Sequence, residues 1–306
     1  MLKKILRRVA LTLIVLFGVT IIAFVLVRLS PGDPAVQMLP ATATEEQILN
    51  MRERMGLNEP YIIQYFMYLG NLLKGDLGFS FHFNMDCGAL ILARLINTAK
   101  ITIIGVLIAL IISIPLGMIA GIKRGTAVDT AATAFALCGQ AMSPVWLCLL
   151  MILIFSVGLK WLPTQGVGTW KHMVMPSLCV GFSFCSLVTR MLRSSMIDVL
   201  QEEYITATRA RGISKFVVYV KYAFKNAILP IVTISGAQLG LLLAGSMVIE
   251  QIFNWPGLGQ LTVTAISSRD FQLVQSILVV VAIIMVLCNL LVDILYTFID
   301  KRVSFN

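Results

Sequence analysis

The chain has 306 residues, of which 58% are hydrophobic and 13% are charged, and its formal net charge is +9. So little charge in so apolar a chain excludes an ordinary soluble domain and is typical of a membrane protein. The excess of lysine and arginine lies mainly beside hydrophobic stretches, and no basic groove with interleaved aromatic residues occurs. Nucleic acid is therefore not an expected partner, and the positive charge is expected to set membrane topology.

Six stretches are long and apolar enough to cross a membrane, which takes about 20 residues in a helix. Alternating barrel-strand patterns are absent, so each stretch is predicted to be a helix. The start, MLKKILRR, resembles a signal peptide, but the apolar run after it is too long and lacks a small-residue cleavage pattern, so a retained first anchor is expected. In chain order the predicted spans are Val9–Val27, Ile101–Ile122, a stretch within Thr130–Leu159, Met173–Thr189, a stretch within Ala227–Ile249, and Leu273–Val292.

Lysine and arginine beside the spans predict which side of the membrane each end occupies. With the N-terminus in the cytoplasm, the basic residues of 1–8, 123–124, 190–225 and 301–302 all fall on the cytoplasmic side. The predicted fold class is therefore all-α: a polytopic membrane protein with six transmembrane helices, both termini cytoplasmic, and a helical extracytoplasmic segment between the first two spans. The expected parts are an N-terminal anchor helix at 1–28, the extracytoplasmic segment at 29–98 and a core domain at 99–306.

Four prolines lie in or beside the predicted spans, namely Pro115, Pro144, Pro176 and Pro230. Proline removes a backbone donor and clashes with the preceding turn, so each one can kink or end a helix. Two readings stay open: ordinary membrane-helix prolines, and kinks that line a path through the membrane.

The predicted extracytoplasmic segment carries local signals for turns and short helices. LSPGDP at 29–34 has turn chemistry that would stop the first span. Thr44 and Gln47 form a capping-box pattern for a short helix through about Met55, and a second helix is predicted at 58–73. The aromatic, amphipathic sequence of that second helix fits either a membrane interface or packing on other helices.

A second interrupted segment, EQIFNWPGLGQLTVTAISSRDF, follows the fifth predicted span. Trp255, Pro256, Gly257 and Gly259 predict a compact turn with an interfacial aromatic ring. The segment is moderately apolar but too interrupted to span, so a re-entrant or surface helix is expected.

No catalytic constellation occurs in the sequence. The patterns GxxxxGK[ST], HExxH and GxSxG are absent, so we expect no ATP hydrolysis by this chain, no catalytic residue and no bound cofactor. His82, Met85, Asp86 and Cys87 lie within six residues, but so close a set in an irregular segment is weak evidence for a metal site, and an interfacial loop is expected instead. The other five cysteines lie in predicted spans, where a thiol packs as a small apolar group.

Ionisable residues in the middle of spans are the usual markers of ion-coupled transport, and this chain has almost none. Arg190, Glu250 and Asp293 lie near span ends, where they can reach water or a partner. An ion-coupled secondary transporter is therefore a distant alternative, and the energy for any transport is expected to come from another chain.

A polar, basic stretch at 202–230, which we call the basic island, separates the fourth and fifth predicted spans. Ala207 and Ala210 would share one small face of a short helix, which Gly212 can end with a positive φ. Ser214 would then cap the next helix, with Pro230 at the entry to the fifth span. The apolar stripe of that next helix is predicted at Phe216, Val220, Ala223 or Phe224, and Ala227. Two short helices meeting at a glycine would project into the cytoplasm; an amphipathic loop lying on anionic lipid is the alternative.

The basic island resembles part of a known family. TATRARGIS at 206–214, followed by KNAILP with Pro230 eighteen residues after Gly212, is similar to the cytoplasmic EAA loop of binding-protein-dependent ABC importer permeases, with the spacing of their peptide and nickel branch. The resemblance continues in order through nearly the whole chain. It includes LSPGDP at 29–34, GLNEPYIIQY at 56–65, GDLGFS at 75–80, FSVGLKWLPTQG at 155–166, TRMLRSSMIDVL at 189–200, EQIFNWPGLGQL at 250–261, SRDFQLVQ at 268–275 and NLLVDILY at 289–296.

In that family the loop forms a coupling helix that sits in a cleft of an ATPase subunit. The resemblance implies a coupling loop here at about 198–230. The residues that it implies for the ATPase contact are Ala207, Arg209, Ala210, Arg211 and Gly212. The motif's glutamate falls at Thr206 and its second alanine at Thr208, so no glutamate contact is implied.

The resemblance also implies a function, that of a permease subunit of an ATP-driven ABC importer in the bacterial plasma (inner) membrane. The expected partners are a second homologous permease, two cytoplasmic ATPase subunits that use the ATP, an extracytoplasmic substrate-binding protein, and membrane lipid. The segments 29–98 and 250–275 are the expected docking surface for the binding protein. Dipeptides or oligopeptides are the expected substrates, and nickel or a metal chelate stays open as the alternative.

Overall fold

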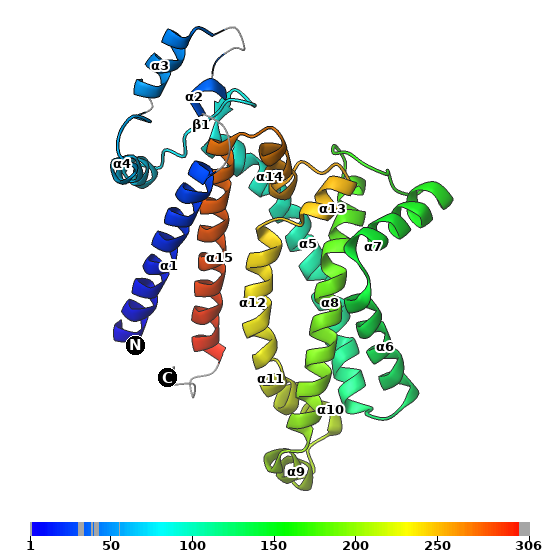
Figure 1. Ribbon diagram of the computed structural model, residues 1–306. Coiled ribbons are helices and arrows are strands. Elements are labelled where there is room, and N and C mark those ends of the chain that lie inside the picture. Colours follow the sequence, from blue (N-terminus) through cyan, green and yellow to red (C-terminus); the bar gives the residue numbers. More distant parts are fainter. Residues whose placement is uncertain (1, 30–33, 38, 40–42, 55, 300–306) are drawn as a thin grey trace. The chain divides into compact units, whose positions relative to one another are not determined.

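A computed structural model describes residues 2–29, 34–37, 39, 43–54 and 56–299, most of them in helices (Figure 1). The α-helices are α1 (Leu2–Leu29), α2 (Pro34–Gln37), α3 (Glu45–Arg54), α4 (Tyr61–Leu73), α5 (Cys87–Ile122), α6 (Ala127–Ala141), α7 (Pro144–Met151), α8 (Trp170–Leu200), α9 (Glu203–Ala210), α10 (Lys215–Val217), α11 (Phe224–Ala227), α12 (Leu229–Leu243), α13 (Met247–Ile252), α14 (Leu258–Ser267) and α15 (Phe271–Ile299). Two π-helical stretches, η1 (Ile152–Gly158) and η2 (Val218–Ala223), and two strands, β1 (Phe79–Ser80) and β2 (Met85–Asp86), complete the elements of the described residues.

The chain divides into two compact units. Unit 1 combines Met1–Leu95 with Leu261–Ile283, and unit 2 combines Ile96–Gln260 with Ile284–Asn306. Most of the predicted LSPGDP turn, and the terminal Lys301 and Arg302, lie outside the described residues.

The six predicted spans fall on four continuous helices and two bent pairs. The continuous spans are Leu11–Leu29, Cys87–Ile122, Trp170–Leu200 and Phe271–Val292. The bent pairs are Ala127–Ala141 with Pro144–Gly158, at 105°, and Lys215–Ala227 with Leu229–Leu243, at 42°. The described chain therefore holds four apolar spans, or six if each bent pair crosses as one.

Two of the four prolines mark these bends. Pro144 is the first residue of α7, where its missing N–H breaks no helical hydrogen bond, and Pro230 lies in the first turn of α12. Pro115 and Pro176 instead lie inside the continuous helices α5 and α8. Two of the four prolines therefore coincide with breaks between helices, and the other two are tolerated inside long helices.

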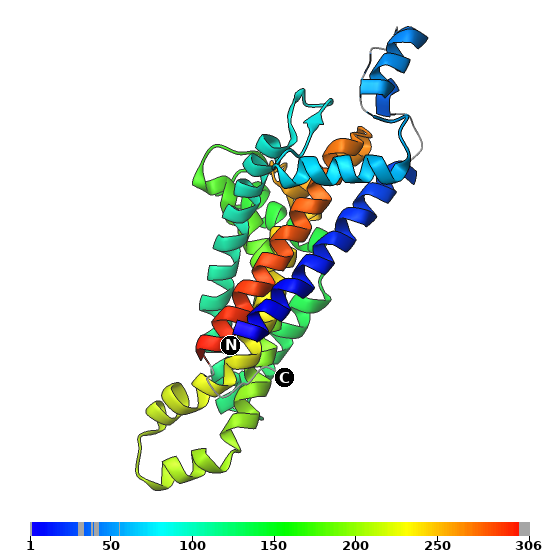
Figure 2. The same ribbon diagram turned by 90° about the vertical axis from the view of Figure 1, so that its left-hand side faces the viewer.

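In unit 1, α4 lies across α1 (Figure 2), and aromatic rings join the two helices. Tyr65 meets Phe17 and Phe24 edge-on, with ring centroids 6.0 and 5.5 Å apart, and its hydroxyl lies 2.9 Å from that of Thr20. A second face of α4, which carries Phe66, is apolar and exposed. One face therefore packs on a helix while another is available to lipid, so the two uses predicted for this segment are compatible.

A short antiparallel hairpin in unit 1 departs from the all-helical prediction. Residues 79–80 pair with residues 85–86, and the Ser80 hydroxyl donates to the Asp270 carboxylate at 2.6 Å. The same carboxylate accepts the backbone N–H of Leu273 at 3.1 Å. Asp270 therefore ties the hairpin to the first turn of α15.

In unit 2, α5 and α8 pack at close range through glycines. A Cβ on Gly105 would lie 2.4 Å from the Ser177 carbonyl oxygen, and one on Gly181 would lie 2.3 Å from that of Gly105. Gly117 and Gly121 of α5 approach α8 in the same way. Small residues let helix backbones come close and gain van der Waals contact, which is a main attraction between helices in lipid. Glycines therefore determine how closely α5 and α8 approach each other.

Candidate functional site

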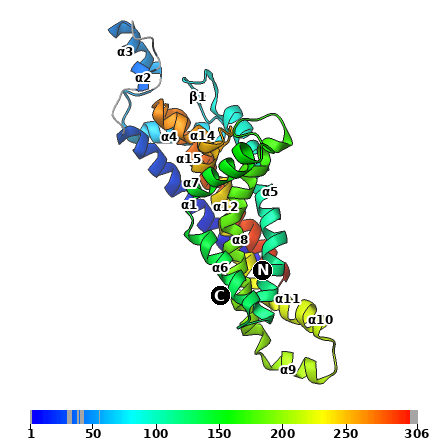
Figure 3. The same ribbon diagram turned by 90° about the vertical axis from the view of Figure 1, so that its right-hand side faces the viewer.

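The basic island folds into short helices joined at a glycine (Figures 2 and 3). α9 ends at Ala210, Gly212 follows with a φ of 75°, and α10, η2 and α11 lead the chain to α12. Glycine adopts this left-handed conformation without the steric cost of a Cβ atom. The predicted helix, its glycine end and the entry to the next long helix at Pro230 are confirmed.

The outer face of α9 and the turn after it carry the residues that the resemblance singled out. Ala207, Arg209, Ala210, Arg211 and Gly212 are all exposed, and nothing lies within 4 Å of the Cβ position at Gly212. Small side chains permit the close approach of another protein, and guanidinium groups pair with carboxylates through two parallel hydrogen bonds. The arrangement suits an acidic cleft of a partner.

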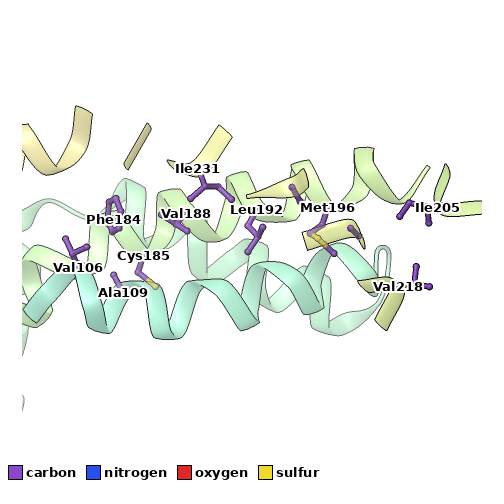
Figure 4. Close-up of a cluster of buried hydrophobic side chains, with 12 residues drawn as sticks. Val106, Ala109, Phe184, Cys185, Val188, Leu192, Met196, Ile205, Val218 and Ile231 are labelled. Carbon is purple, nitrogen blue, oxygen red and sulfur yellow. The ribbon is translucent and has the colours of Figure 1, made fainter. Parts of the chain in front are cut away.

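The opposite face of α9 is buried in the hydrophobic core of unit 2 (Figure 4). Ile205 and Val218 are both 0% exposed and lie in one cluster with Leu192 and Met196 of α8. The cluster continues along α8 to Phe184. The apolar side of α9 is therefore covered by its own chain, and the basic island forms a knob on the core.

Polar contacts hold the two arms of the knob together. The Asn226 amide donates to the Tyr204 hydroxyl at 2.6 Å, and that hydroxyl donates to the Tyr222 carbonyl at 3.5 Å. Within α9, the buried Thr208 hydroxyl donates to the Tyr204 carbonyl at 2.6 Å. Since Tyr204 belongs to α9 while Tyr222 and Asn226 lead to α12, these hydrogen bonds join the two arms of the knob.

A second polar centre lies at Glu250 of α13, beneath the turn that leads to α14. Its side chain is 0% exposed; one carboxylate oxygen accepts the Thr98 hydroxyl at 2.7 Å and the other accepts the Gln260 N–H at 2.9 Å. Thr98 in turn accepts the Leu258 N–H at 2.8 Å. A Cβ on Gly257 would lie 2.4 Å from the carboxylate, so the turn closes directly over it. Of the two expectations for Glu250, water or a partner, the structure shows the partner, because the glycine-rich turn covers the carboxylate.

The same turn buries Trp255. The indole N–H donates to the Asn97 carbonyl at 3.1 Å, and the Asn97 amide donates to the Pro256 carbonyl, also at 3.1 Å. The predicted compact turn is confirmed. The prediction of an interfacial ring is wrong, because the turn folds the ring into a core cluster.

Both halves of the sequence match known protein families. Residues 113–305 match the family described as "Binding-protein-dependent transport system inner membrane component". Residues 1–102 match "Binding-prot-dependent transport system membrane comp, N-term". The chain belongs to this family. The resemblance to ABC importer permeases is thereby confirmed, and the chain is a multi-pass protein of the bacterial inner membrane.

Full-length relatives carry the names of peptide permeases. The "Dipeptide transport system permease protein DppB" of Alkalihalophilus pseudofirmus is 37% identical, covering 100% of both chains. The "Oligopeptide transport system permease protein AppB" of Bacillus subtilis is 35% identical over 98% of this chain and 99% of its own. The "Glutathione transport system permease protein GsiC" of Escherichia coli is 35% identical over 100% of both chains.

Solved structures show the same fold. Two inward-facing crystal forms of the MetNI methionine ABC transporter match with TM-scores of 0.56 and 0.59, at 18% and 16% identity. Each match covers 69% of this chain and 96% of the solved chain. At this identity the likeness concerns the fold alone.

One detail of the permease knob contradicts the sequence pattern. Phe216 is 74% exposed and Val220 is exposed as well, whereas Val218, Ala223 and Ala227 are buried. The predicted stripe is confirmed at Ala223 and Ala227 and is wrong at Phe216 and Val220. Residues 218–223 are π-helical, and the wider i→i+5 turn places Val218 in the core instead. Ser214 takes the predicted N-cap position, but its hydroxyl makes no capping hydrogen bond.

An ion pair that the sequence did not reveal joins α6 to α8. Arg193 holds both oxygens of Asp129, through Nε to Oδ1 and through Nη2 to Oδ2, the latter at 2.8 Å. The Gly125 N–H also donates to Asp129 at 2.9 Å. The partners are 64 residues apart, and no local pattern links them.

The segment considered for metal binding has other contacts. Cys87 is fully buried at the first position of α5, and the His82 ring packs edge-on against Phe83 with centroids 4.9 Å apart. Within the part of the chain that the structure describes, no three His, Cys, Asp or Glu side chains are grouped as metal ligands would be.

Proposed function

We propose that this permease forms, with a second homologous permease, the translocation path of an ATP-driven importer of dipeptides or oligopeptides. Two cytoplasmic ATPase subunits would supply the energy, and an extracytoplasmic binding protein would deliver the substrate. The permease itself would bind no cofactor. The proposed topology has six crossings with both termini in the cytoplasm, an anchor at 1–28, an outer segment at 29–98 and the permease core at 99–306.

The observation that carries this proposal is the two-sided construction of α9. Its outer face presents Ala207, Ala210 and two arginines to solvent, and its inner face buries Ile205 in the core that runs along α8. We assign Ala207, Arg209, Ala210, Arg211 and Gly212 to the ATPase contact. Closure of the ATPases would push the knob, and the packed core would pass that displacement to the helices that open and close the path.

Peptides are the proposed substrates because the full-length relatives described above carry dipeptide, oligopeptide and glutathione names. Nickel or a metal chelate was the alternative from sequence, and no observation on this chain favours it. Calorimetry of the cognate binding protein against a peptide series and against nickel chelates tests the substrate directly.

The coupling assignment is tested in proteoliposomes that contain the complete transporter, with uptake of a labelled peptide and ATP hydrolysis measured together. Gly212→Val places a β-branched residue at a φ of 75°, where no neighbour lies within 4 Å. The backbone strain of about 1–3 kcal/mol must therefore be relieved by moving the turn beside α9. We expect normal membrane insertion, retained basal ATP hydrolysis, and loss of both uptake and its stimulation of ATP hydrolysis.

Gly125→Val is the matched control, because Gly125 has a φ of 78°, has equally open surroundings and lies outside the basic island. It should retain coupled uptake. Coupled uptake by Gly212→Val would refute the coupling assignment, and full, ATP-independent transport by the permease alone would refute the importer.

A further inference from the structure

Unit 1 contains a polar cavity of about 490 Å³, within the size range of ligand sites. Its wall is formed by residues of α4, the hairpin loop, the last turns of α1 and the first turns of α15. Arg28 and Arg269 bring two positive charges to its wall, and Asp270 brings one negative charge. The oxygens of Asp270 accept hydrogen bonds from Ser80 and Leu273, so the carboxylate is held against the hairpin and the first turn of α15.

The wall also holds buried polar atoms that lack a protein partner among the described residues. Gln64 is 7% exposed and Gln275 is 4% exposed. The Gln64 Nε2 group donates to the carbonyls of Leu57 and Glu59, at 3.1 and 2.7 Å, while its Oε1 atom has no donor. The side chains of Tyr68 and Gln275 interact with each other, but the Tyr68 hydroxyl and Gln275 Nε2 make no hydrogen bond of ordinary geometry. Each such group costs about 1–3 kcal/mol when left unsatisfied, so a ligand that supplied the missing partners would be stabilised at this wall.

An apolar groove of about 370 Å³ continues from this cavity. The two share Val27, Arg269 and Phe271, and the groove is completed by aliphatic side chains of α1, α14 and α15. These residues are Leu26, Ile266, Val274 and Leu278. A pocket lined by two arginines thus adjoins an apolar groove, which matches a molecule with an anionic head and an aliphatic tail.

The depth of the site in the membrane agrees with this chemistry. The candidate spans end at Leu29 in α1 and begin at Phe271 in α15, so the polar cavity lies at span ends, where headgroups are found, and the groove runs toward the hydrocarbon region. Arginine at a span end extends its charged group toward the interface.

We propose that unit 1 binds one anionic phospholipid of the phosphatidylglycerol class. Its phosphate pairs with Arg28 and Arg269, and a headgroup hydroxyl donates to Gln64 Oε1. The donors of Gln275 and Tyr68 serve ester or phosphate oxygens, and one acyl chain fills the groove. A choline headgroup has no hydroxyl to offer Gln64 and adds a positive charge beside two arginines, so phosphatidylcholine should bind more weakly.

Native mass spectrometry of the complete transporter, delipidated and then titrated with phosphatidylglycerol, phosphatidylcholine or glycerophosphoglycerol, tests the site. The double variant Arg28→Gln, Arg269→Gln should lose roughly tenfold or more in phosphatidylglycerol binding, the usual weight of a charge-assisted hydrogen bond. Lys74→Gln removes one charge of an exposed residue of unit 1 that does not line the cavity and should bind as the parent does. Arg269→Lys, which keeps the charge, should recover part of the loss.

Leu278→Trp should block the acyl chain and so weaken phosphatidylglycerol but not glycerophosphoglycerol. Equal phosphatidylglycerol binding by the parent and the double arginine variant would overturn the proposal. Equal affinity for glycerophosphoglycerol and the intact lipid would also overturn it, since the site would then bind only a free anion. A photo-crosslinking residue at Val274 that captures a protein chain instead of lipid would show that the second permease fills the groove. These readouts do not involve peptide uptake, so they are independent of the proposed function.

Discussion

Ile205 packs the proposed coupling helix α9 against the core. Truncating this side chain gives the sharpest test of whether the core transmits motion from α9 to the membrane helices. Ile205→Ala deletes three carbon atoms from a side chain that is 0% exposed. At about 0.8 kcal/mol per buried carbon, the transfer loss is about 2.4 kcal/mol, and the cavity left behind adds to it. Thr208 is the other buried residue of α9, so most of this loss falls on the docking of α9. At 1.4 kcal/mol per factor of ten, α9 should open roughly fiftyfold more often.

Hydrogen exchange of the assembled transporter measures this opening directly. Amides of 203–210 should exchange roughly fiftyfold faster while those of the central part of α8 are unchanged, and peptide uptake should fall with basal ATP hydrolysis retained. Phe216→Ala is the control, since it also truncates an apolar residue of the basic island but one that is 74% exposed. Unaltered exchange in α9, or faster exchange with normal uptake, would refute the reasoning that the core transmits the motion.

Three further substitutions test the packing of unit 2 by thermal unfolding in detergent. Gly105→Ala puts a Cβ 2.4 Å from a carbonyl oxygen of α8 and should destabilise the protein by about 1–3 kcal/mol. Gly18→Ala is the control, because nothing lies within 4 Å of that Cβ position. Equal melting temperatures of the two variants would contradict the close helix contact. Glu250→Gln leaves either the Gln260 N–H or another buried group without a hydrogen bond and should lower the stability by about 1–3 kcal/mol. Hydrogen exchange of the amides at 257–260 should become faster. Unchanged exchange there would count against the role of Glu250 in organising the turn. Asp129→Asn should cost about 1.5–3 kcal/mol by weakening two charge-assisted bonds to its arginine partner, and an unchanged melting temperature would show that the ion pair contributes nothing.

What the sequence predicts correctly is encoded over a few residues. The capping box of Thr44 and Gln47 forms as expected, with the Thr44 N–H donating to the Gln47 side chain at 3.0 Å, and Gly212 ends α9 in a left-handed conformation. Long apolar runs between charges likewise locate the spans, because crossing hydrocarbon sets a minimum length. These features depend on propensity, spacing and hydropathy, all of which are visible in one sequence.

What the sequence misses depends on tertiary contacts or on a change of helical register. The buried Glu250 carboxylate is hydrogen-bonded to Thr98, a residue 152 positions away. The sequence around either residue gives no sign that the two meet. The buried face of the knob falls on Val218 instead of Phe216, because a π-helical turn replaces the α-helical spacing from which the stripe was read. The cavity proposed to bind a phospholipid is likewise formed by segments far apart in the chain.

The proposed coupling and the Glu250 turn share structural parts, which bears on how motion would cross unit 2. α8 supplies Leu192 and Met196 to the core cluster beneath α9, and Met175 and Cys179 to the cluster beneath the Glu250 turn. Leu242 of α12 packs against both clusters. A continuous helix of 31 residues is about 46 Å long, and close-packed cores transmit displacement because they are not continuously deformable. A push on the knob would therefore move α8 as one body and shift the packing under the Glu250 turn, so the two ends of unit 2 respond together without a separate signalling pathway.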